Sequence, residues 1–562
     1  MPLAVCLFLV HKDFMHTIMK YLILAFYSCW TFFLQAQTKK ESPFSLNGSE
    51  KEIIGRIQFA STRDSLEQNH FVNDYMLTPK SDLFFGVSLQ KTLTAYQKDI
   101  APDLSLEALF RQGNFQFTLF VDGKEIYRSN LAPGAPMQDF QNSKLVLKRP
   151  LIDNRQGQGS WSESFWNRFV ANGGAEALTD GKHKIRLEIR PYVQRDSIIV
   201  GEVIASGDLP IDVSLNPVVI ADQYMLRKPT QYHDVKPANG KFDRQRLKQL
   251  KGMIELGVFK KINGLVVLKH GDLLIEEYFN GESRDSLHDP RSVGKTFAST
   301  LLGMAIADGY IRDEYQTLDK YYDLTKYNNP DPGKNGTTLY DLLTMSAGFD
   351  GDDSDPNSPG NEENMYPMSN WVDFALNLPF KKNLKGSWHY FTAGVVVLGD
   401  VLNQKVNGGL ESYAQKNLFA PLGIVNYRWQ YTPQGVPNTA GGIRMNALDF
   451  AKFGQLYKNE GVWQGKQILS KQWVQKSLSK KMTIPGRANE YYGYLFWNKS
   501  FQLGGNDYEA YYCAGNGGNY IIILKDHPYV IVITSSAYGQ FYAHQQVDRI
   551  MKEYVLPALL NY

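Results

Sequence analysis

Cysteine is scarce in this chain. Only Cys6, Cys29 and Cys513 occur among the 562 residues, and the first two lie in an N-terminal segment that we expect to be removed. A chain left with one cysteine forms no internal disulfide bond, so it must be stabilised by its hydrophobic cores. This excludes the class of small domains that depend on disulfide bonds.

An excess of one charge is also absent. The 60 Lys and Arg residues nearly balance the 57 Asp and Glu residues, which leaves a formal net charge of +3. We therefore expect neither nucleic acid nor an anionic membrane surface as a partner. With 43% apolar and 21% charged residues, the composition is that of an ordinary globular protein, and the length allows about two to four domains.

The one apolar run that resembles a targeting segment lies near the N-terminus. Residues Met19–Gln37 begin with a lysine after the methionine, continue with an apolar run interrupted by Ser28 and Cys29, and end near Ala36. The run is short for a membrane span, and a small residue at the cleavage position is typical of a secretory signal. We predict a signal peptide over residues 1–37, with translation from an internal methionine as an alternative start, and export to the periplasm or the medium. A retained or lipid-anchored form is the less favoured alternative.

Short alternating segments separated by turn residues dominate the first part of the remaining chain. Residues 115–121 alternate apolar and polar side chains, and Asp122–Gly123 supplies a hairpin turn. Further strand candidates follow, and the one helix that we expect here covers residues 163–171. These features predict an all-β sandwich over residues 45–225 and a linker over 226–240. We expect this accessory domain either to bind another macromolecule or to pack on the next domain.

The pattern changes to mixed helices and strands over residues 241–562. It predicts a helix at 242–256, a hairpin around His270–Asp272, strands at 520–524 and 529–533, and a helix at 542–556. Segments between these ends are helical or looped. The fold class that we predict is multidomain, with the all-β sandwich followed by an α/β domain whose sheet is closed by both termini and which includes a helical subdomain.

Ser292 and Lys295 stand out as candidate catalytic residues. They lie three positions apart at the start of an apolar helical segment, which places both on one face within a single turn. The helix N-terminus and burial both disfavour an ammonium ion there, so the lysine is suited to act as a base or proton relay. The spacing also occurs at Ser88–Lys91 and Ser477–Lys480, but only Ser292 begins a long apolar helix. A phosphate-binding loop is excluded because Asp289 stands where the upstream glycine is required.

At these residues the sequence resembles the serine β-lactamase and penicillin-binding-protein superfamily, in its class C-like branch of esterases, D-amino peptidases and amide hydrolases. The segments that carry the resemblance are Leu268–Tyr278, Arg291–Phe297, Thr338–Gly348 and Ala440–Gly454, which follow in the family's order. It extends over about residues 240–562. The resemblance implies a β-lactamase-like fold and acyl transfer through a serine.

The family's second motif, a tyrosine followed two residues later by asparagine, falls at Tyr390 and Thr392. The resemblance implies that Tyr390, close to Lys295, carries a proton to and from the serine and the leaving group. Thr392 replaces the asparagine, so the amide is lost and a smaller polar group is expected to contact the substrate.

The family's third motif, Lys-Thr-Gly or His-Thr-Gly, falls at Cys513–Gly515, where only the glycine is kept. Because the cation and the hydroxyl are lost, the anchor for a substrate carboxylate is absent, which argues against β-lactam recognition. The segment instead resembles the Gly-x-Gly-Gly variant of relatives that act on esters and linear amides. The resemblance implies an oxyanion hole from the N–H of Ser292 and that of Gly515 or Asn516, with Gly517 in the same substrate-binding segment. Cys513 is disfavoured as a nucleophile because no histidine lies in this segment.

No metal or organic cofactor is expected. The acidic residues between Asp350 and Glu363 fit no calcium loop and predict a solvated loop at the rim of the cleft, and the histidines form no zinc signature. His389 is expected to pack beside Tyr390.

The sequence thus predicts an exported serine hydrolase that cleaves esters or amides of small molecules or short peptides through an acyl-enzyme. Two alternatives stay open at this point. One is a penicillin-binding or D-amino peptidase role on peptidoglycan, and the other is a non-catalytic binding protein on the same fold.

Overall fold

The computed structural model describes residues 54–133, 144–154 and 161–560. The predicted signal peptide, residues 1–37, lies outside the described residues, as do Cys6 and Cys29. Within the described part of the chain, no helix combines the length and the apolar character that crossing a membrane requires.

The N-terminal region contains two β-sheets. The first has the order β1 (Gln58–Ala60), β3 (Leu83–Ser88), β6 (Val146–Ile152). The second has the order β2 (Tyr75–Leu77), β9 (Ala205–Val213), β7 (Gly181–Gln194), β4 (Gly113–Val121), β5 (Lys124–Asn130), with β8 (Ile198–Val200) paired to β7. The sheets share one hydrophobic core, in which Phe85 of β3 meets Phe117 of β4 edge to face, with ring centroids 6.2 Å apart.

This region is sheet-rich, but the all-β sandwich is not confirmed, because several helices also occur in it. The helix expected at 163–171 is present as α6 (Trp161–Phe169). Further helices are α3 (Arg63–Glu67), α4 (Leu93–Ile100), α5 (Leu106–Gln112) and α7 (Ala175–Ala177), with the π-turn η2 (Val170–Gly174) before α7. Thr92 and Ser105 begin α4 and α5, because each side chain accepts a backbone N–H three residues on. These caps are the signal that the strand-based interpretation overlooked.

The chain between β9 and α8 contains the short turn η3 (Ala221–Gln223) and follows the C-terminal region closely. Within the predicted linker, the N–H of Ala238 donates to the carbonyl of Leu273 at 2.8 Å. The N-terminal region itself contacts the C-terminal region through its side chains. Asn167 Nδ2 donates to Gln540 Oε1 at 2.8 Å, and Lys260 Nζ donates to Asn154 Oδ1 at 3.1 Å.

The C-terminal region is built on an eight-stranded antiparallel sheet. Its order is β11 (Asp272–Tyr278), β10 (Ile262–Lys269), β21 (Tyr529–Ser535), β20 (Asn519–Leu524), β19 (Asn506–Gly515), β18 (Trp497–Leu503), β17 (Tyr491–Tyr492), β16 (Met482–Thr483). Strand β10 pairs with both β11 and β21, so the first hairpin of the region lies beside its last strand. The expected closure of the sheet by both ends is present.

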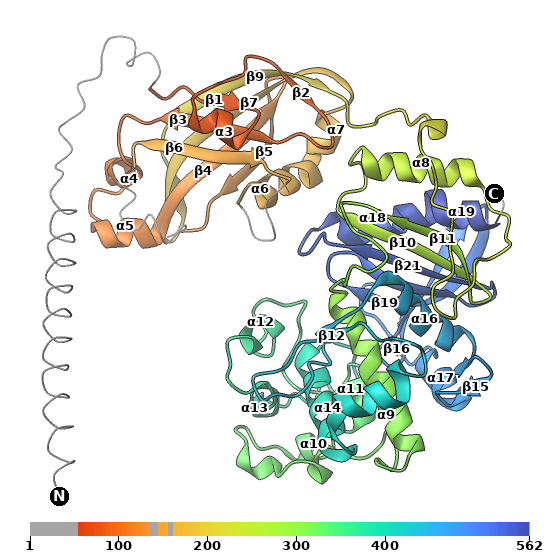
Figure 1. Ribbon diagram of the computed structural model, residues 1–562. Helices are drawn as coiled ribbons and strands as arrows, with labels where there is room; N and C mark the ends of the chain where they lie inside the picture. The colour runs from red at the N-terminus through yellow and green to blue at the C-terminus, as the bar shows by residue number, and fades with distance from the viewer. Residues whose placement is uncertain (1–53, 134–143, 155–160, 561–562) are drawn as a thin grey trace, which may run out of the picture.

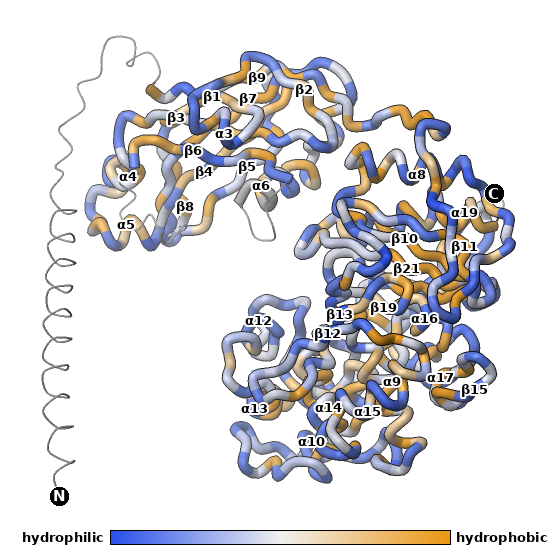
Figure 2. The backbone as a smooth tube through the Cα atoms, viewed as in Figure 1, coloured by the Kyte–Doolittle hydropathy of each residue, from blue (hydrophilic) through white to orange (hydrophobic). Residues whose placement is uncertain are grey.

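Helices cover both faces of this sheet (Figure 1). One layer contains α8 (Arg244–Glu255), α18 (Tyr542–Arg549), η8 (Ile550–Val555) and α19 (Leu556–Leu560), and the other contains α16 (Ala447–Lys458), which packs on β10, β20 and β21. Helix α9 (Lys295–Ala307) extends into the helical part of the region. Every residue of β20 and β21 is buried, and Figure 2 shows the apolar colour of this part of the sheet. Strands covered on both faces are expected to be continuously apolar.

A helical subdomain packs around α9. Its helices are α10 (Pro332–Asn335), α11 (Leu339–Leu343), α12 (Glu362–Met365), α13 (Trp371–Asn377), α14 (Thr392–Lys405) and α15 (Gly409–Ala414), which continues into η7 (Gln415–Phe419). The short elements η5 (Leu318–Lys320), η6 (Leu324–Lys326), β12 (Arg428–Trp429), β13 (Ile443–Arg444), β14 (Val462–Trp463), β15 (Lys466–Gln467) and α17 (Lys471–Ser477) complete the fold. Because residues 295–305 of α9 are all buried, this helix is the centre of the subdomain.

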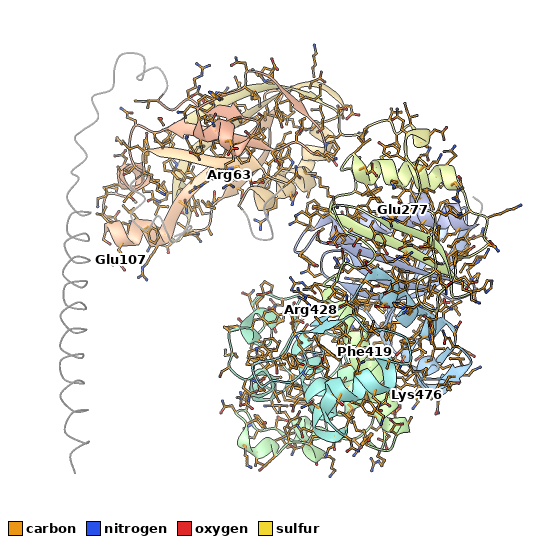
Figure 3. All side chains as sticks on the ribbon, viewed as in Figure 1. Arg63, Glu107, Glu277, Phe419, Arg428 and Lys476 are labelled. Carbon is orange, nitrogen blue, oxygen red and sulfur yellow. The ribbon has the colours of Figure 1, made fainter. Side chains whose placement is uncertain are left out.

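Phe297 fixes α9 against its neighbours. Its ring stacks on Phe453 of α16 with centroids 4.0 Å apart and meets Phe419, labelled in Figure 3, at 6.2 Å. The side chain is 0% exposed. Phe297 therefore joins the sheet-side helix to the helical subdomain.

Replacing Phe297 with alanine is expected to lower the free energy of unfolding by about 3–5 kcal/mol, because a large buried side chain is removed and a cavity remains. Urea denaturation followed by circular dichroism measures the change. Phe541→Ala is the matched control, because Phe541 is 46% exposed and its loss is expected to cost less than about 1 kcal/mol. Equal losses in the two variants would contradict the packing described here.

Candidate active site

Ser292 lies in a short turn that leads directly into the buried helix. The 3₁₀ turn η4 (Arg291–Gly294) precedes α9, whose first residue is Lys295. Lys295 is 1% exposed, and its Nζ lies 2.8 Å from the Oγ of Ser292, in hydrogen-bond contact. The two residues that the sequence selected by their spacing are thus brought together.

A second segment holds the lysine from the opposite side. Lys295 Nζ donates to the carbonyl oxygen of Ala440 at 2.8 Å. The next residue, Gly441, comes so close to the turn that a Cβ there would lie 2.9 Å from the carbonyl oxygen of Arg291. Glycine is required at this approach because a side chain would displace the backbone that carries Ser292.

The end of β19 contacts the same turn. A Cβ on Gly515 would lie 1.9 Å from the carbonyl oxygen of Pro290 and 3.1 Å from the backbone nitrogen of Ser292. The pairing of β18 with β19 ends where Trp497 meets Tyr512. Beyond this point, β19 is paired by β20 on one side only in the described structure.

The register of β19 shows which of its N–H groups face the unpaired side. The carbonyls of Glu509 and Gly515 accept bonds from Lys525 and Gly518, so the odd-numbered residues point toward β20. Because successive peptide groups of a strand point to opposite sides, the alternation directs the N–H of Ala514 away from β20, and Asn516 lies in the turn after the strand. Of the two donors that the family resemblance left open, Gly515 is paired with Asn519 of β20, and Asn516 follows the end of the strand.

The turn after β19 is held by a polar network. Asn516 Oδ1 accepts the N–H of Gly539 at 2.8 Å, and Asn519 Nδ2 donates to the carbonyl of Asn516 at 2.9 Å. Asn519 Oδ1 in turn accepts from His288 Nε2 at 2.7 Å, and burial lowers the pKa of His288. Gly517 has φ +92°, and a Cβ there would meet the ring of Tyr538 at 2.7 Å, which explains the glycine in this turn.

Tyr390 lies beside Lys295, as the resemblance implied. Lys295 Nζ is 5.1 Å from the centroid of the Tyr390 ring. Trp497 stacks on this ring with centroids 5.9 Å apart, and the Trp388 ring lies 6.2 Å away. Tyr492 contacts both tryptophans, with centroids 5.8 and 4.9 Å from theirs. An aromatic cluster of Trp388, Tyr390, Tyr492 and Trp497 therefore borders the Ser292–Lys295 pair.

Thr392 lies at the start of the helix that follows Tyr390. It is the first residue of α14 and is 1% exposed, and the contact of its hydroxyl with the substrate stays a prediction. Among the described residues, this hydroxyl has no hydrogen-bond partner. The N–H of Thr392 donates to Asp353 Oδ2 at 2.8 Å.

Asp353 is a site residue that sequence reasoning missed. We expected its acidic loop to be solvated, but the Asp353 carboxylate is bonded to the backbone next to Tyr390, whereas Asp355 is exposed as predicted. Asp353 lies in a run of acidic residues, and no rule based on residue spacing predicts which of them contacts the site. Among the described residues, no group of three His, Cys, Asp or Glu side chains is arranged to hold a metal ion.

Two other residues near the site are buried, as expected. Cys513 is 1% exposed, and burial raises the pKa of its thiol to about 12, with the contact to Thr296 opposing the shift. A thiol of this kind is protonated at neutral pH and is a poor nucleophile. His389 is 4% exposed with a pKa lowered by burial, and its Nδ1 lies 2.9 Å from the carbonyl of Ser387.

The antiparallel sheet, the helical subdomain and the serine–lysine pair between them define a β-lactamase-like domain. The family model described as Beta-lactamase matches residues 252–553, more than half of the 562 residues. The chain therefore belongs to the beta-lactamase family.

The solved structures to which the chain is similar are distant in sequence. The octameric penicillin-binding protein homologue from Pyrococcus abyssi is 19% identical with a TM-score of 0.41, over 54% of this chain and 74% of that one. The penicillin binding protein from Bacillus halodurans is 18% identical with a TM-score of 0.40, over 52% and 96%. The D-stereospecific amidohydrolase from Streptomyces sp. is 17% identical with a TM-score of 0.41, over 52% and 93%. These similarities are too distant to indicate a substrate. No curated protein matches the sequence.

Replacing Gly515 with alanine is expected to destabilise the protein by about 1–3 kcal/mol, because the new methyl group would overlap the backbone at Pro290. Urea denaturation measures the loss. Gly336→Ala is the control, since a Cβ there would lie 3.8 Å from its nearest neighbour and the residue has an ordinary φ of −82°. Unchanged stability of Gly515→Ala would contradict the close approach of β19 to the serine turn.

Proposed function

We propose that this protein is an exported serine hydrolase that cleaves ester or linear amide bonds through an acyl-enzyme on Ser292. The observation that carries the proposal is the contact between the Ser292 hydroxyl and the buried Lys295 amine at 2.8 Å. A base within hydrogen-bond distance is what a serine hydroxyl needs to become a nucleophile. The substrate is a small molecule or a short peptide, and no cofactor takes part in the proposed reaction.

In the first half of the reaction, Ser292 Oγ forms a bond to the carbonyl carbon while its proton passes to Lys295. Tyr390, beside the amine, carries a proton from this pair to the leaving alcohol or amine, and the bond between carbonyl carbon and leaving group breaks. In the second half, water attacks the acyl-enzyme, its proton is taken up by the same groups, and the carboxylic acid is released with Ser292 restored.

Negative charge develops on the carbonyl oxygen in both halves. We assign its stabilisation to the N–H groups of Ser292 and Asn516. The contact of Gly515 with the Ser292 turn brings the two segments together, and Asn516 is the first residue after the strand end at Gly515. Donors held by backbone in this way require little reorganisation during the reaction.

The surroundings favour an uncharged substrate at this position. Cys513 and Ala514 stand where the family pattern places a cation and a hydroxyl, and Cys513 is buried. The aromatic cluster offers apolar surface next to Tyr390. We therefore place esters and linear amides with apolar groups ahead of β-lactams and carboxylate-terminated peptides.

Replacing Ser292 with alanine is expected to reduce hydrolysis of a p-nitrophenyl ester by at least about 10³-fold and to abolish labelling by a fluorophosphonate probe, because the nucleophile is removed. Ser88→Ala and Ser477→Ala are matched controls, since both residues are followed by a lysine at the same spacing. Ser477 instead donates to the carbonyl of Trp473 at 2.8 Å. Full esterase activity in Ser292→Ala would refute the mechanism. Absence of turnover and of labelling in the wild type would favour a binding protein.

Replacing Tyr390 with phenylalanine is expected to lower kcat by about 10²–10⁴-fold, because the packing ring is kept and the proton carrier is lost. Stopped-flow acylation with the same ester measures the step directly. Tyr492→Phe is the control, as Tyr492 belongs to the same aromatic cluster without contacting Lys295 in any described interaction.

Strong covalent labelling of the wild type by a fluorescent penicillin would favour the peptidoglycan alternative instead.

Export is the part of the proposal that rests on the sequence alone. Met19–Gln37 supports it through its lysine, its short apolar run and Ala36. Expression of the full chain with a C-terminal tag, followed by N-terminal sequencing of the periplasmic and secreted fractions, is expected to show a mature chain that begins near residue 37. Recovery of the full-length chain from the cytoplasm alone would contradict export.

A further inference from the structure

Asp353 connects the acidic loop to the backbone at Tyr390 and at Thr392. Its N–H donates to the carbonyl of Tyr390 at 2.8 Å. Its Oδ2 accepts the N–H of Thr392, and its Oδ1 accepts the N–H of Glu362, each at 2.8 Å. One aspartate thus bonds to the backbone at residues 390 and 392 and to the start of α12.

The contact with Thr392 supplies a cap that α14 lacks locally. The residue before the helix is Phe391, which has no side-chain oxygen to accept a first-turn N–H. Thr392 is 1% exposed, so an unpaired N–H there would be costly. A carboxylate at a helix N-terminus both accepts the free N–H and interacts favourably with the helix dipole. Asp353 performs this task from a separate segment.

The ring of Tyr390 depends on this backbone for its position. The interactions described for its side chain are ring contacts with Lys295, Trp388 and Trp497. Such contacts leave the ring free to shift if the peptide groups on either side move. A small displacement of a proton-transfer group is enough to lower the rate strongly.

We propose that Asp353, in its carboxylate form, is a positioning residue that holds Tyr390 beside Lys295. This inference rests on the proposed role of Tyr390 in the reaction. An aspartate serves here because its two oxygens accept one N–H each, whereas an asparagine of the same shape has a single accepting oxygen.

The protonation of Asp353 makes this arrangement sensitive to pH. Burial raises the pKa of its carboxyl to about 6; the charge of Glu362 adds to the shift, while the hydrogen bond from the N–H of Thr392 opposes it. Tyr366, which follows α12, also faces this carboxyl. As the pH falls through about 6, the carboxylate takes up a proton and loses accepting capacity, so we expect kcat to fall with it.

The decisive experiment is a double-mutant cycle between Asp353 and Tyr390. We expect Asp353→Asn to lower kcat for a p-nitrophenyl ester about 10- to 100-fold, with KM changed less than about 3-fold, because a transition-state interaction is weakened. In the Tyr390→Phe background, the same substitution is expected to have almost no further effect. Asp355→Asn, an exposed residue of the same loop, is the control and is expected to retain wild-type kcat.

An equal loss in both backgrounds, or no loss at all, would overturn the positioning role. If Tyr390→Phe itself has wild-type kcat, the proposed function fails at Tyr390, which is a different result from failure at Asp353. Circular dichroism and melting temperature establish that each variant is folded.

The pH profile of kcat provides a test that does not depend on the folding of Asp353→Asn. The wild type is expected to lose activity with a midpoint near pH 6. In Glu362→Gln this midpoint is expected to move to lower pH, because the like charge that raises the pKa of Asp353 is removed. A midpoint that does not move would show that another group controls the acidic limb and would overturn the pH dependence assigned to Asp353.

Discussion

The contact between the Lys295 amine and the Ser292 hydroxyl is the constraint to which the rest of the site conforms. A buried amine is costly unless its hydrogens have partners, and here Ser292 and the carbonyl of Ala440 each lie 2.8 Å from Nζ. The amine cannot be reached from solvent or moved without loss of both contacts. Burial of residues 295–305 on α9 makes the helix a rigid support for this pair.

Three chain segments meet at Ser292 although they are distant in sequence. Gly441 and Gly515 allow the loop before β13 and the end of β19 to contact the turn at distances that a side chain would prevent. The third segment carries Tyr390, whose backbone is bonded to Asp353. The loop before β13 supplies the carbonyl that binds Lys295. The end of β19 supplies a strand edge beside the serine turn, and the third segment supplies the phenol of Tyr390. The site is therefore defined by backbone approaches as much as by side chains.

Sequence reasoning succeeded where a local rule applies. The spacing of Ser292 and Lys295 predicted their contact, and short runs of apolar residues predicted the hairpin and the final strands of the sheet. It failed where tertiary context decides. Thr392 is buried at the start of α14 and its N–H is bonded to Asp353, a contact that its motif position did not predict. The bonds of Asp353 to the backbone at residues 390 and 392 join separate segments, which no single sequence displays. The helices α4 and α5 were missed although Thr92 and Ser105 offered local caps.

The pairing of β10 with β21 has a consequence for how this region is made. Val266 lies opposite Val532, so partners in the interior of the sheet are separated by most of the region's length. Forming such a contact costs entropy, because a long segment of chain must be closed into a loop. Proteins rich in contacts of this kind fold slowly. During synthesis the apolar hairpin emerges long before the strand that covers its edge, and an uncovered edge of this composition is prone to aggregation. The nascent chain therefore has to be protected until its last strand has left the ribosome.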